Sequence, residues 1–209
     1  MTKNEKGRSI ETLPIDSTKL CCNFVNTVYA WKGDNSYDFL VDYLAFNKWC
    51  IRLAVFEPAT LDKLRLLADK MPAKAAKAMN EIRKVRHLLH AFLSSIAQKN
   101  PEQTNLLLDK INPLLSGAHS NIYLKHTGET YLLSYKNADI DLMTPVRVVL
   151  KSLYDLLTSD EMGRVKECPG CGWIFYDETK NGKRRWCNPV NCGTKDKMTR
   201  YYKKLTGRN

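Results

Sequence analysis

Four cysteines near the C-terminal end constrain this chain more than any other feature. Two residues separate the first pair, four separate the second, and fifteen lie between the pairs. Cysteine pairs at this spacing can place four thiolates around one tetrahedral ion, and Zn²⁺ is the ion such sites usually hold. We therefore predict a structural zinc site whose ligands are Cys168, Cys171, Cys187 and Cys192. Four sulfur ligands would leave no coordination position for a catalytic water.

The residues around the cysteines predict a small module of turns and short strands. Pro169, Gly170 and Gly172 suit the tight turn that aims two sulfurs at one metal. Strands are expected over 165–168, 173–176 and 183–186, with a turn at Asn181-Gly182 and a helix over 193–204. Free thiols and disulfides are the alternatives. A redox dithiol would need only one pair in a βαβ context, which the sequence lacks.

Most of the excess positive charge lies in this module. The formal net charge is +11, and from Gly163 onward twelve Lys or Arg face four Asp or Glu. Such a basic patch favours a polyanionic partner, with double-stranded DNA as the first choice and a solubilising tail as the alternative. The candidate nucleic-acid-binding residues are Lys183, Arg184, Arg185, Lys195, Lys197, Arg200, Lys203 and Lys204. Trp186, Tyr201 and Tyr202 are expected in the module's core or as stacking partners.

Helical periodicity dominates the chain before the cysteines. The expected helices are 39–51, capped by Asp38; 58–71; 73–99; 102–115, with Pro113 ending regular hydrogen bonding; and 144–159, capped by Thr144. Leu44, Ile51 and Leu106 are assigned to inner faces. A β-hairpin is expected from 121–125 and 130–136. The predicted fold class is α+β: a mainly helical N-terminal domain with a small hairpin, residues 1–160, then a small treble-clef or ribbon-like zinc finger ending in a helix, residues 161–209.

Several polar and sulfur-containing residues within this helical part carry weaker signals. Residues 20–29 fit either a strand or a helix, and two amides, Asn23 and Asn26, interrupt that apolar run. Such amides must be hydrogen-bonded if buried, so anchoring neighbouring backbone competes with ligand binding. Cys21, Cys22 and Cys50 are expected to be buried small hydrophobes. His87 and His90 have a spacing that permits metal binding, but no third ligand is evident.

The termini and the hydropathy pattern bear on localisation. No run of about 18 apolar residues exists, so no transmembrane helix is expected and the membrane is not a predicted partner. The first dozen residues are polar, lack the apolar segment of a secretory signal, and are expected to be a frayed tail. The expected location is therefore the cytoplasm.

Three segments and the cysteine module resemble one known family. The pattern C-x2-C-G-W-x-F-x-D-x-T…RRWC-x4-C-G, followed by a basic helix, resembles the CGNR zinc finger. LCCNFVNT at 20–27, IRKVRHLLHAF at 82–92 and SLYDLLTS at 152–159 are similar to segments of the ABATE-domain family of bacterial stress-induced transcription regulators. The signature Cys-Gly-Asn-Arg reads Cys192-Gly193-Thr194-Lys195 here, which keeps the charge but loses the planar guanidinium.

The resemblance implies a zinc-dependent, DNA-binding regulator whose N-terminal domain dimerises, binds a small-molecule effector, or both. The candidate pocket residues are Asn23, Asn26, Arg83 and Arg86. The second hypothesis is a protein- or RNA-binding module in which the finger is a structural cap. An enzyme is the least favoured, because the sequence has no nucleophile elbow, phosphate loop, paired-carboxylate cluster or open metal site.

Overall fold

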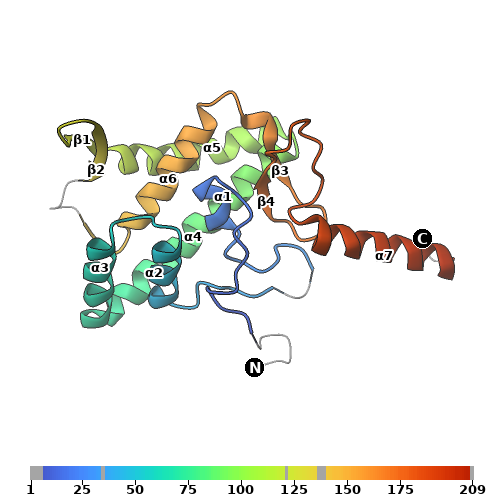
Figure 1. Cartoon of the computed structure of the whole chain (residues 1–209), viewed down its shortest axis with the longest axis horizontal. Coiled ribbons are helices and arrows are strands. Elements are labelled where there is room, and N and C mark those ends of the chain that lie inside the picture. Colours follow the sequence, from blue (N-terminus) through green and yellow to red (C-terminus); the bar gives the residue numbers. More distant parts are fainter. Residues whose placement is uncertain (1–6, 34–35, 121, 136–139, 208–209) are drawn as a thin grey trace.

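A long central helix organises the fold. The computed structural model describes residues 7–33, 36–120, 122–135 and 140–207. In it, helix α4, Pro72–Ala97, packs against helices of the N-terminal part and against both strands of the cysteine module (Figure 1). Its buried face follows the predicted three- and four-residue spacing: Ala75, Met79, Ile82, Val85, Leu89 and Phe92. A helix buried along one stripe in this way is an amphipathic core helix.

Three helices precede α4 along the chain. They are α1, Leu20–Val25; α2, Tyr43–Arg52; and α3, Pro58–Lys70. The ambiguous segment at 20–29 therefore begins as a helix. Phe24 of α1 meets Phe46 and Trp49 of α2, with ring centroids 6.4 and 5.7 Å apart. Cys21, Cys22 and Cys50 are fully buried beside these rings, as predicted.

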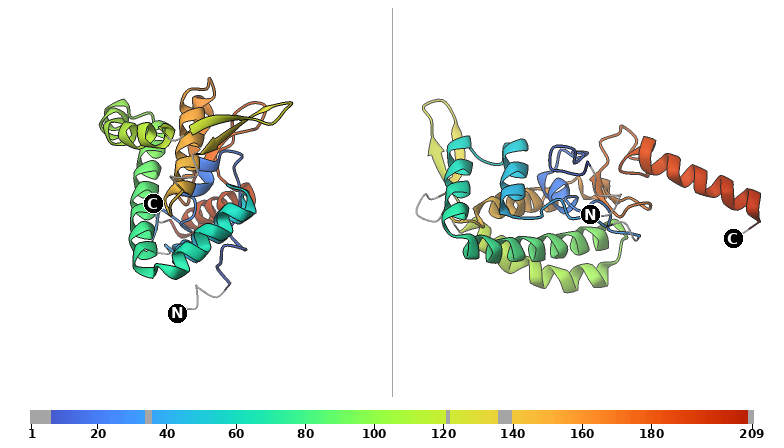
Figure 2. Two further views of the ribbon diagram at one scale, coloured as in Figure 1. Left: turned by 90° about the vertical axis from the view of Figure 1, so that its left-hand side faces the viewer. Right: turned by 90° about the horizontal axis from the view of Figure 1, so that it is seen from below.

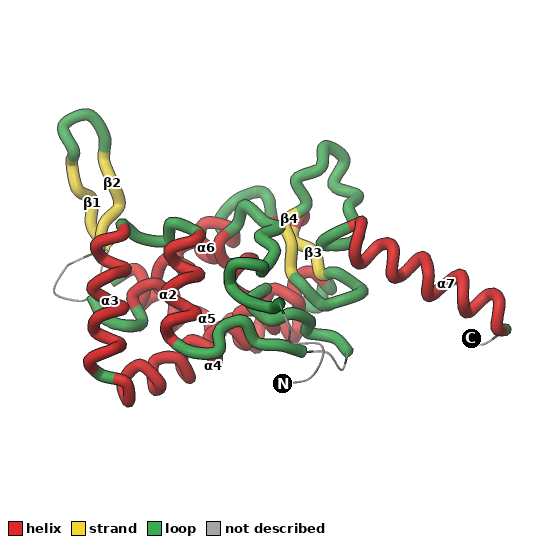
Figure 3. The backbone as a smooth tube through the Cα atoms, turned by 60° about the horizontal axis from the view of Figure 1, so that its bottom comes forward, coloured by secondary structure: helices red, strands yellow, loops and turns green. Residues whose placement is uncertain are grey.

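Helices α5 and α6 and a β-hairpin complete the N-terminal part. Helix α5 spans Pro101–His119, and α6, Thr144–Leu157, packs on both α5 and α1. Strands β1, Ile122–His126, and β2, Tyr131–Tyr135, pair antiparallel, with Leu124 opposite Leu133. This confirms the predicted hairpin, which stands away from the helices (Figure 3).

The predicted break at Pro113 is wrong, because α5 continues through it to His119. Proline removes the hydrogen bond to the carbonyl four residues earlier, which belongs to Asp109. Asp109 is exposed, so water can solvate that carbonyl and the helix persists. Buried Ile111, Leu115 and Ala118 lie on either side of the proline and hold both halves against the core.

Two predicted caps and three predicted inward residues are also wrong. Helix α2 begins at Tyr43, and its N-cap is Asp42, whose carboxylate accepts a hydrogen bond from Ala45 N at 2.7 Å. Asp38 instead pairs with arginines of α4. The residue before α6 is Met143, and Thr144 is already its first helical residue. Leu44, Ile51 and Leu106 are about half exposed, because the buried stripes of α2 and α5 run one residue away.

The first residues are not wholly a tail. Ile10 and Leu13 are buried in the core, and their carbonyls accept hydrogen bonds from Arg52 Nη1. Residues 1–6 of the predicted tail lie outside the described part. Within the described residues, no helix is both long and apolar enough to cross a membrane.

The cysteine module forms the end of the molecule opposite the hairpin. It contains strands β3, Val165–Glu167, and β4, Ile174–Tyr176, a π-helical turn η3, Pro189–Gly193, and helix α7, Thr194–Thr206. Helix α7 projects from the body (Figures 1 and 2). The predicted fold class, a mainly helical α+β domain followed by a small cysteine-containing finger that ends in a helix, is confirmed. The boundary at residue 160 stays a prediction.

Candidate metal centre and nucleic-acid interface

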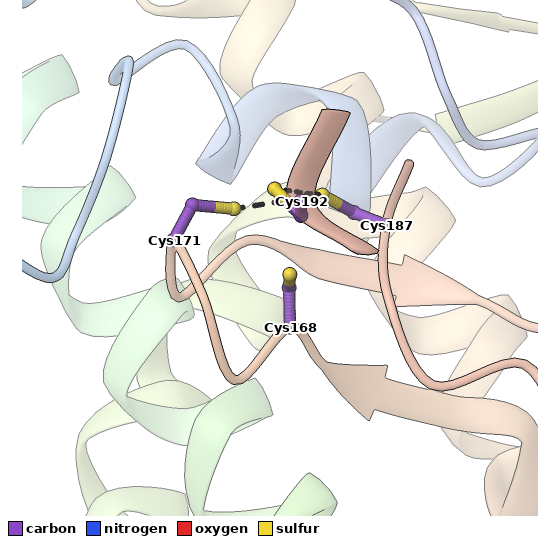
Figure 4. Close-up of side chains that lie close together, drawn as sticks. All are labelled: Cys168, Cys171, Cys187 and Cys192. Carbon is purple, nitrogen blue, oxygen red and sulfur yellow. Dashed lines mark hydrogen bonds between the residues drawn. The ribbon is translucent and has the colours of Figure 1, made fainter. Parts of the chain in front are cut away.

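The four cysteine sulfurs converge on one point. The Sγ atoms of Cys168, Cys171, Cys187 and Cys192 all lie within 4.8 Å of one another (Figure 4). Cys187 Sγ is 3.5 Å from Cys171 Sγ and 3.8 Å from Cys192 Sγ. Tetrahedral zinc with Zn–S bonds of about 2.3 Å has sulfur–sulfur edges of about 3.8 Å. The group therefore fits a four-coordinate metal ion, and in the described residues no other cluster of three or more His, Cys, Asp or Glu side chains could hold one.

The first cysteine pair is shaped by the β3–β4 turn. Cys168 N donates to Trp173 O at 2.8 Å, and Gly172 N donates to Cys168 O at 2.9 Å. Gly172 has a φ of +77°, and a Cβ there would lie 2.8 Å from Trp31 Cβ. Only glycine combines this backbone conformation with such a close approach, so the predicted role of glycine in the turn is borne out at this position.

The crowding of sulfurs controls their protonation. Hydrogen bonds from the Cys187 thiol to Cys168 and Cys171, together with burial, raise the pKa of Cys187. Hydrogen bonds from the Cys171 and Cys187 thiols lower the pKa of Cys168, which accepts them. A bound divalent cation would stabilise all four as thiolates.

A buried carboxylate organises the loop between the two cysteine pairs. Asp177 is fully buried and accepts hydrogen bonds from Thr179 N, Arg184 N and Lys166 Nζ, at 3.0, 2.8 and 2.6 Å. Burial alone would raise the pKa of Asp177, but the hydrogen bonds from Lys166, Thr179 and Arg184 hold it well below its usual range. The third strand predicted at 183–186 is wrong, since Arg184 N donates to this carboxylate rather than to a strand.

The finger is attached to the helical part by specific polar contacts. Asn26, 2% exposed, pairs with the backbone of β4: its Nδ2 donates to Ile174 O at 2.7 Å, and its Oδ1 accepts from Ile174 N at 3.0 Å. Trp31 N donates to Cys171 O at 2.8 Å, and Trp173 Nε1 donates to Val28 O at 2.7 Å. The side chain of Asn26 thus takes the place of a neighbouring strand.

The two histidines of α4 belong to this attachment and not to a metal site. His90 stacks on Trp31 with centroids 3.9 Å apart, and its Nε2 donates to Gly172 O at 2.8 Å. His87 meets the same Trp31 ring edge-on at 4.9 Å. Burial lowers the pKa of His90, which keeps the ring neutral. Neither ring joins the cysteine group.

The cationic side chains predicted for nucleic acid differ in availability. Lys183, Arg185, Lys195, Lys197, Arg200, Lys203 and Lys204 are exposed. The exception is Arg184, whose Nε donates to Trp186 O at 2.9 Å and whose guanidinium lies 5.0 Å over the Phe175 ring. Arg200 pairs with Asp196 one turn earlier at 3.0 Å. No residue of α7 is buried, so Tyr201 and Tyr202 are not in the module's core.

The four predicted pocket residues do not form one site. Arg86 is 1% exposed and binds both carboxylate oxygens of Asp38, at 2.7 and 2.6 Å. Arg83 Nη2 donates to the carbonyls of Leu40 and Val41 at 2.7 and 2.8 Å. Asn26 and Arg83 therefore anchor backbone groups, and Arg86 anchors a carboxylate. For Asn26 this is the anchoring role that competes with ligand binding in the sequence analysis. The partners of the two arginines could not be recognised in the sequence, because they lie more than 40 residues away.

Asn23 lines a cleft. The cleft has a volume of about 290 Å³ and lies between the start of α1 and the end of α2. Asn23 is 6% exposed, and its Nδ2 donates to Ser17 O at 2.7 Å. The apolar lining comes from Ile15, Leu20, Leu53, Ala54, Val55 and Val148, and Ser17 and Thr18 also line the cleft.

Comparison with known families assigns both parts of the chain. The profile of the family described as "CGNR zinc finger" matches residues 164–204. The profile of ABATE, described as "Putative stress-induced transcription regulator", matches residues 18–160. Both matches confirm the resemblance drawn from the sequence motifs. No curated protein matches the chain significantly.

Proposed function

Because the chain belongs to the ABATE family and carries a CGNR zinc finger, we propose that it is a zinc-dependent, DNA-binding transcription regulator. The observation that carries the proposal is helix α7. It starts two residues after Cys192, exposes five Lys or Arg side chains, and buries no residue against its own protein. A cationic helix that has no buried residue and is anchored beside a metal site suits a duplex with phosphates on both groove walls.

The metal in this proposal is zinc, held by the four cysteines in a structural role. The two strands of the module are only three residues long each, too short for a stable sheet of their own. Metal binding supplies folding free energy on the order of 10 kcal/mol to such modules. Four sulfurs leave no coordination position for a substrate, so we assign the metal a structural rather than a catalytic role.

The proposal is tested by titrating duplex DNA at several salt concentrations. Log K for the natural protein is expected to fall linearly with log salt, since each neutralised phosphate contributes a slope of about −0.9. Lys197 and Lys204 are seven residues apart and therefore share one face of the helix. The double variant Lys197→Glu plus Lys204→Glu should bind duplex DNA much more weakly and show a smaller dependence of log K on log salt. The matched control is Lys63→Glu plus Lys70→Glu on α3, which makes the same charge change at the same spacing on exposed positions far from the finger.

Equal losses of DNA affinity in both double variants would show that only the net charge matters, and would refute the proposal. Tighter binding of single-stranded RNA than of duplex DNA would instead favour a protein- or RNA-binding module in which the finger is a structural cap. Co-purification with a protein partner at the finger would favour the same alternative. The mass of the free protein and of its DNA complex reports whether it acts as a homodimer.

A small-molecule effector is the second part of the proposal, and the observation that favours it is the cleft beside Asn23. The cleft combines apolar walls with a buried amide that donates only to Ser17 O. It suits a small, largely apolar ligand with one hydrogen-bond donor. Val148→Phe, which fills the cleft from α6, should abolish any ligand-induced rise in thermal midpoint, and an undiminished rise would exclude this site.

A further inference from the structure

The exposed face of α7 is not uniformly cationic. Met198 precedes Tyr201 and Tyr202 by three and four residues, and Leu205 follows them by four and three. These four side chains are 52%, 62%, 58% and 63% exposed, in chain order. At about 100° per residue, these four side chains share one stripe about 100° wide. An exposed apolar stripe on a helix that has no buried residue marks a contact surface.

Lysines border this stripe on both sides. By the same helical geometry, Lys195 lies about 60° to one side of Met198, whereas Lys197 and Lys204 lie about 100° and 120° to the other. All three lysines are exposed. This face of the helix is therefore apolar in the middle and positive at both margins. A partner that binds it must carry negative charge opposite each of the two lysine margins.

Pairing with a second copy of α7 fits this arrangement poorly. The lysine margins of the two helices would face each other, and like charges across an interface oppose association. Four side chains of this size offer on the order of 500 Å² per helix, below the roughly 800 Å² per partner of a standard interface.

The major groove of duplex DNA matches both features. It is about 12 Å wide, admits an α-helix, has a phosphate backbone along each wall, and exposes the thymine methyl group on its floor. We propose that Met198, Tyr201, Tyr202 and Leu205 are the base-contacting face of α7, packed on thymine methyl groups, while Lys195, Lys197 and Lys204 bind the two phosphate walls. The inference rests on the proposed function and adds to it the contacting face and a preference for A·T pairs.

This assignment changes the expected role of Lys195, the last residue of the family signature. Lys195 replaces the signature arginine and lies on the margin of the stripe rather than in its middle. A lysine there neutralises phosphate as a point charge, and the missing bidentate contact to guanine is consistent with reading thymine methyl groups instead.

The test uses two duplexes that differ only in the methyl group. One is an alternating A·T duplex, and the other has every thymine replaced by uracil. Each methyl group packed against the protein contributes about fourfold in affinity, so two such contacts predict a preference of more than tenfold for the thymine duplex. Met198→Gln plus Leu205→Gln should reduce this preference markedly, because only the two tyrosines then remain to pack on methyl groups, and should keep the salt dependence of the natural protein.

The matched control is Lys197→Gln plus Lys204→Gln. It should keep the preference for thymine but lose affinity for both duplexes and reduce the salt slope by about two phosphates. Circular dichroism establishes that α7 is retained in each variant, and Leu205→Gln alone, near the helix end, serves if the double variant loses helix content.

Equal affinity of the natural protein for the two duplexes would overturn the inference and leave the proposed function standing. Absence of salt-dependent binding to either duplex would refute the proposed function itself. The inference would also be overturned if Met198→Gln plus Leu205→Gln left the preference for the thymine duplex unchanged but abolished another interaction. Loss of self-association would then assign the stripe to a second copy of the chain. Loss of binding to vesicles containing phosphatidylglycerol would assign it to a membrane.

Discussion

The pairing of Asn26 with β4 gives the sharpest prediction for stability. The amide makes two hydrogen bonds to one residue, Ile174, 148 positions away in the chain, and both partners are buried. Asn26→Ala removes both bonds and leaves the N–H and C=O of Ile174 without partners in a site closed to water. Leaving a buried polar group unsatisfied costs about 1–3 kcal/mol.

Two such groups predict a loss of about 4 kcal/mol in the free energy of unfolding, a large part of the roughly 5–15 kcal/mol of a typical domain. The assay is urea unfolding of the zinc-loaded protein, followed by circular dichroism and tryptophan fluorescence. Asn112→Ala, at an exposed position of α5, is the matched control and should change stability by less than about 0.5 kcal/mol.

Hydrogen exchange gives an independent measurement at the same atoms. The amide of Ile174 should lose protection in Asn26→Ala, while amides in the middle of α4 keep theirs under conditions where the protein remains folded. A loss below 1 kcal/mol together with unchanged protection of the Ile174 amide would refute the view that this side chain anchors the finger.

The remaining predictions concern the metal turn and its surroundings. Gly172→Ala should lower the free energy of unfolding by about 2–3 kcal/mol and weaken zinc binding, because position 172 combines a positive φ with a Cβ contact of 2.8 Å to Trp31. Gly182→Ala is the control: position 182 has a positive φ but nothing within 4 Å of the added Cβ, so the loss measured by urea unfolding should be only about 1 kcal/mol. Cys187→Ala should abolish stoichiometric zinc binding measured by metal analysis, and retention of one zinc per chain would contradict the assigned ligands. Burial lowers the pKa of His90, so the folded state resists protonation of this ring. The free energy of unfolding therefore includes a contribution from neutral His90 that is complete above the ordinary histidine pKa of about 6.5. This contribution is lost as the pH falls from 6.5 toward the lowered pKa of the folded state. The stability of His90→Gln should therefore depend less on pH between 7.5 and 5.5 than that of the natural protein, and parallel curves would exclude this role.

Local patterns predicted much of this fold. The repeating apolar positions of α4 and the turn signals of the hairpin act over a few residues, so they can be recognised directly in the sequence. The cysteine group was predictable for a different reason. Metal coordination restricts the spacing of its ligands, and the two pairs carry that spacing.

The errors have a common physical origin in tertiary contacts. Asp38 has the right residue type and place to cap a helix, but two arginines of α4 bind its carboxylate, and Asp42 caps α2 instead. A buried arginine is usually paired, so Arg86 needed an acidic partner that sequence periodicity cannot identify. Pro113 failed as a terminator because packing on both sides of it outweighs one lost hydrogen bond.

The position of α7 depends on the whole molecule rather than on the finger alone. Ile174 and Phe175 of the short β4 strand are fully buried, and β4 packs against α1 and α4. The turn that carries Cys171 accepts hydrogen bonds from Trp31 and Lys32, and His90 holds its next residue, Gly172. A finger cut at residue 160 would expose these apolar side chains and lose these donors. The family boundary in the sequence is therefore not a boundary in packing, and the helical domain sets the direction in which the basic helix is presented.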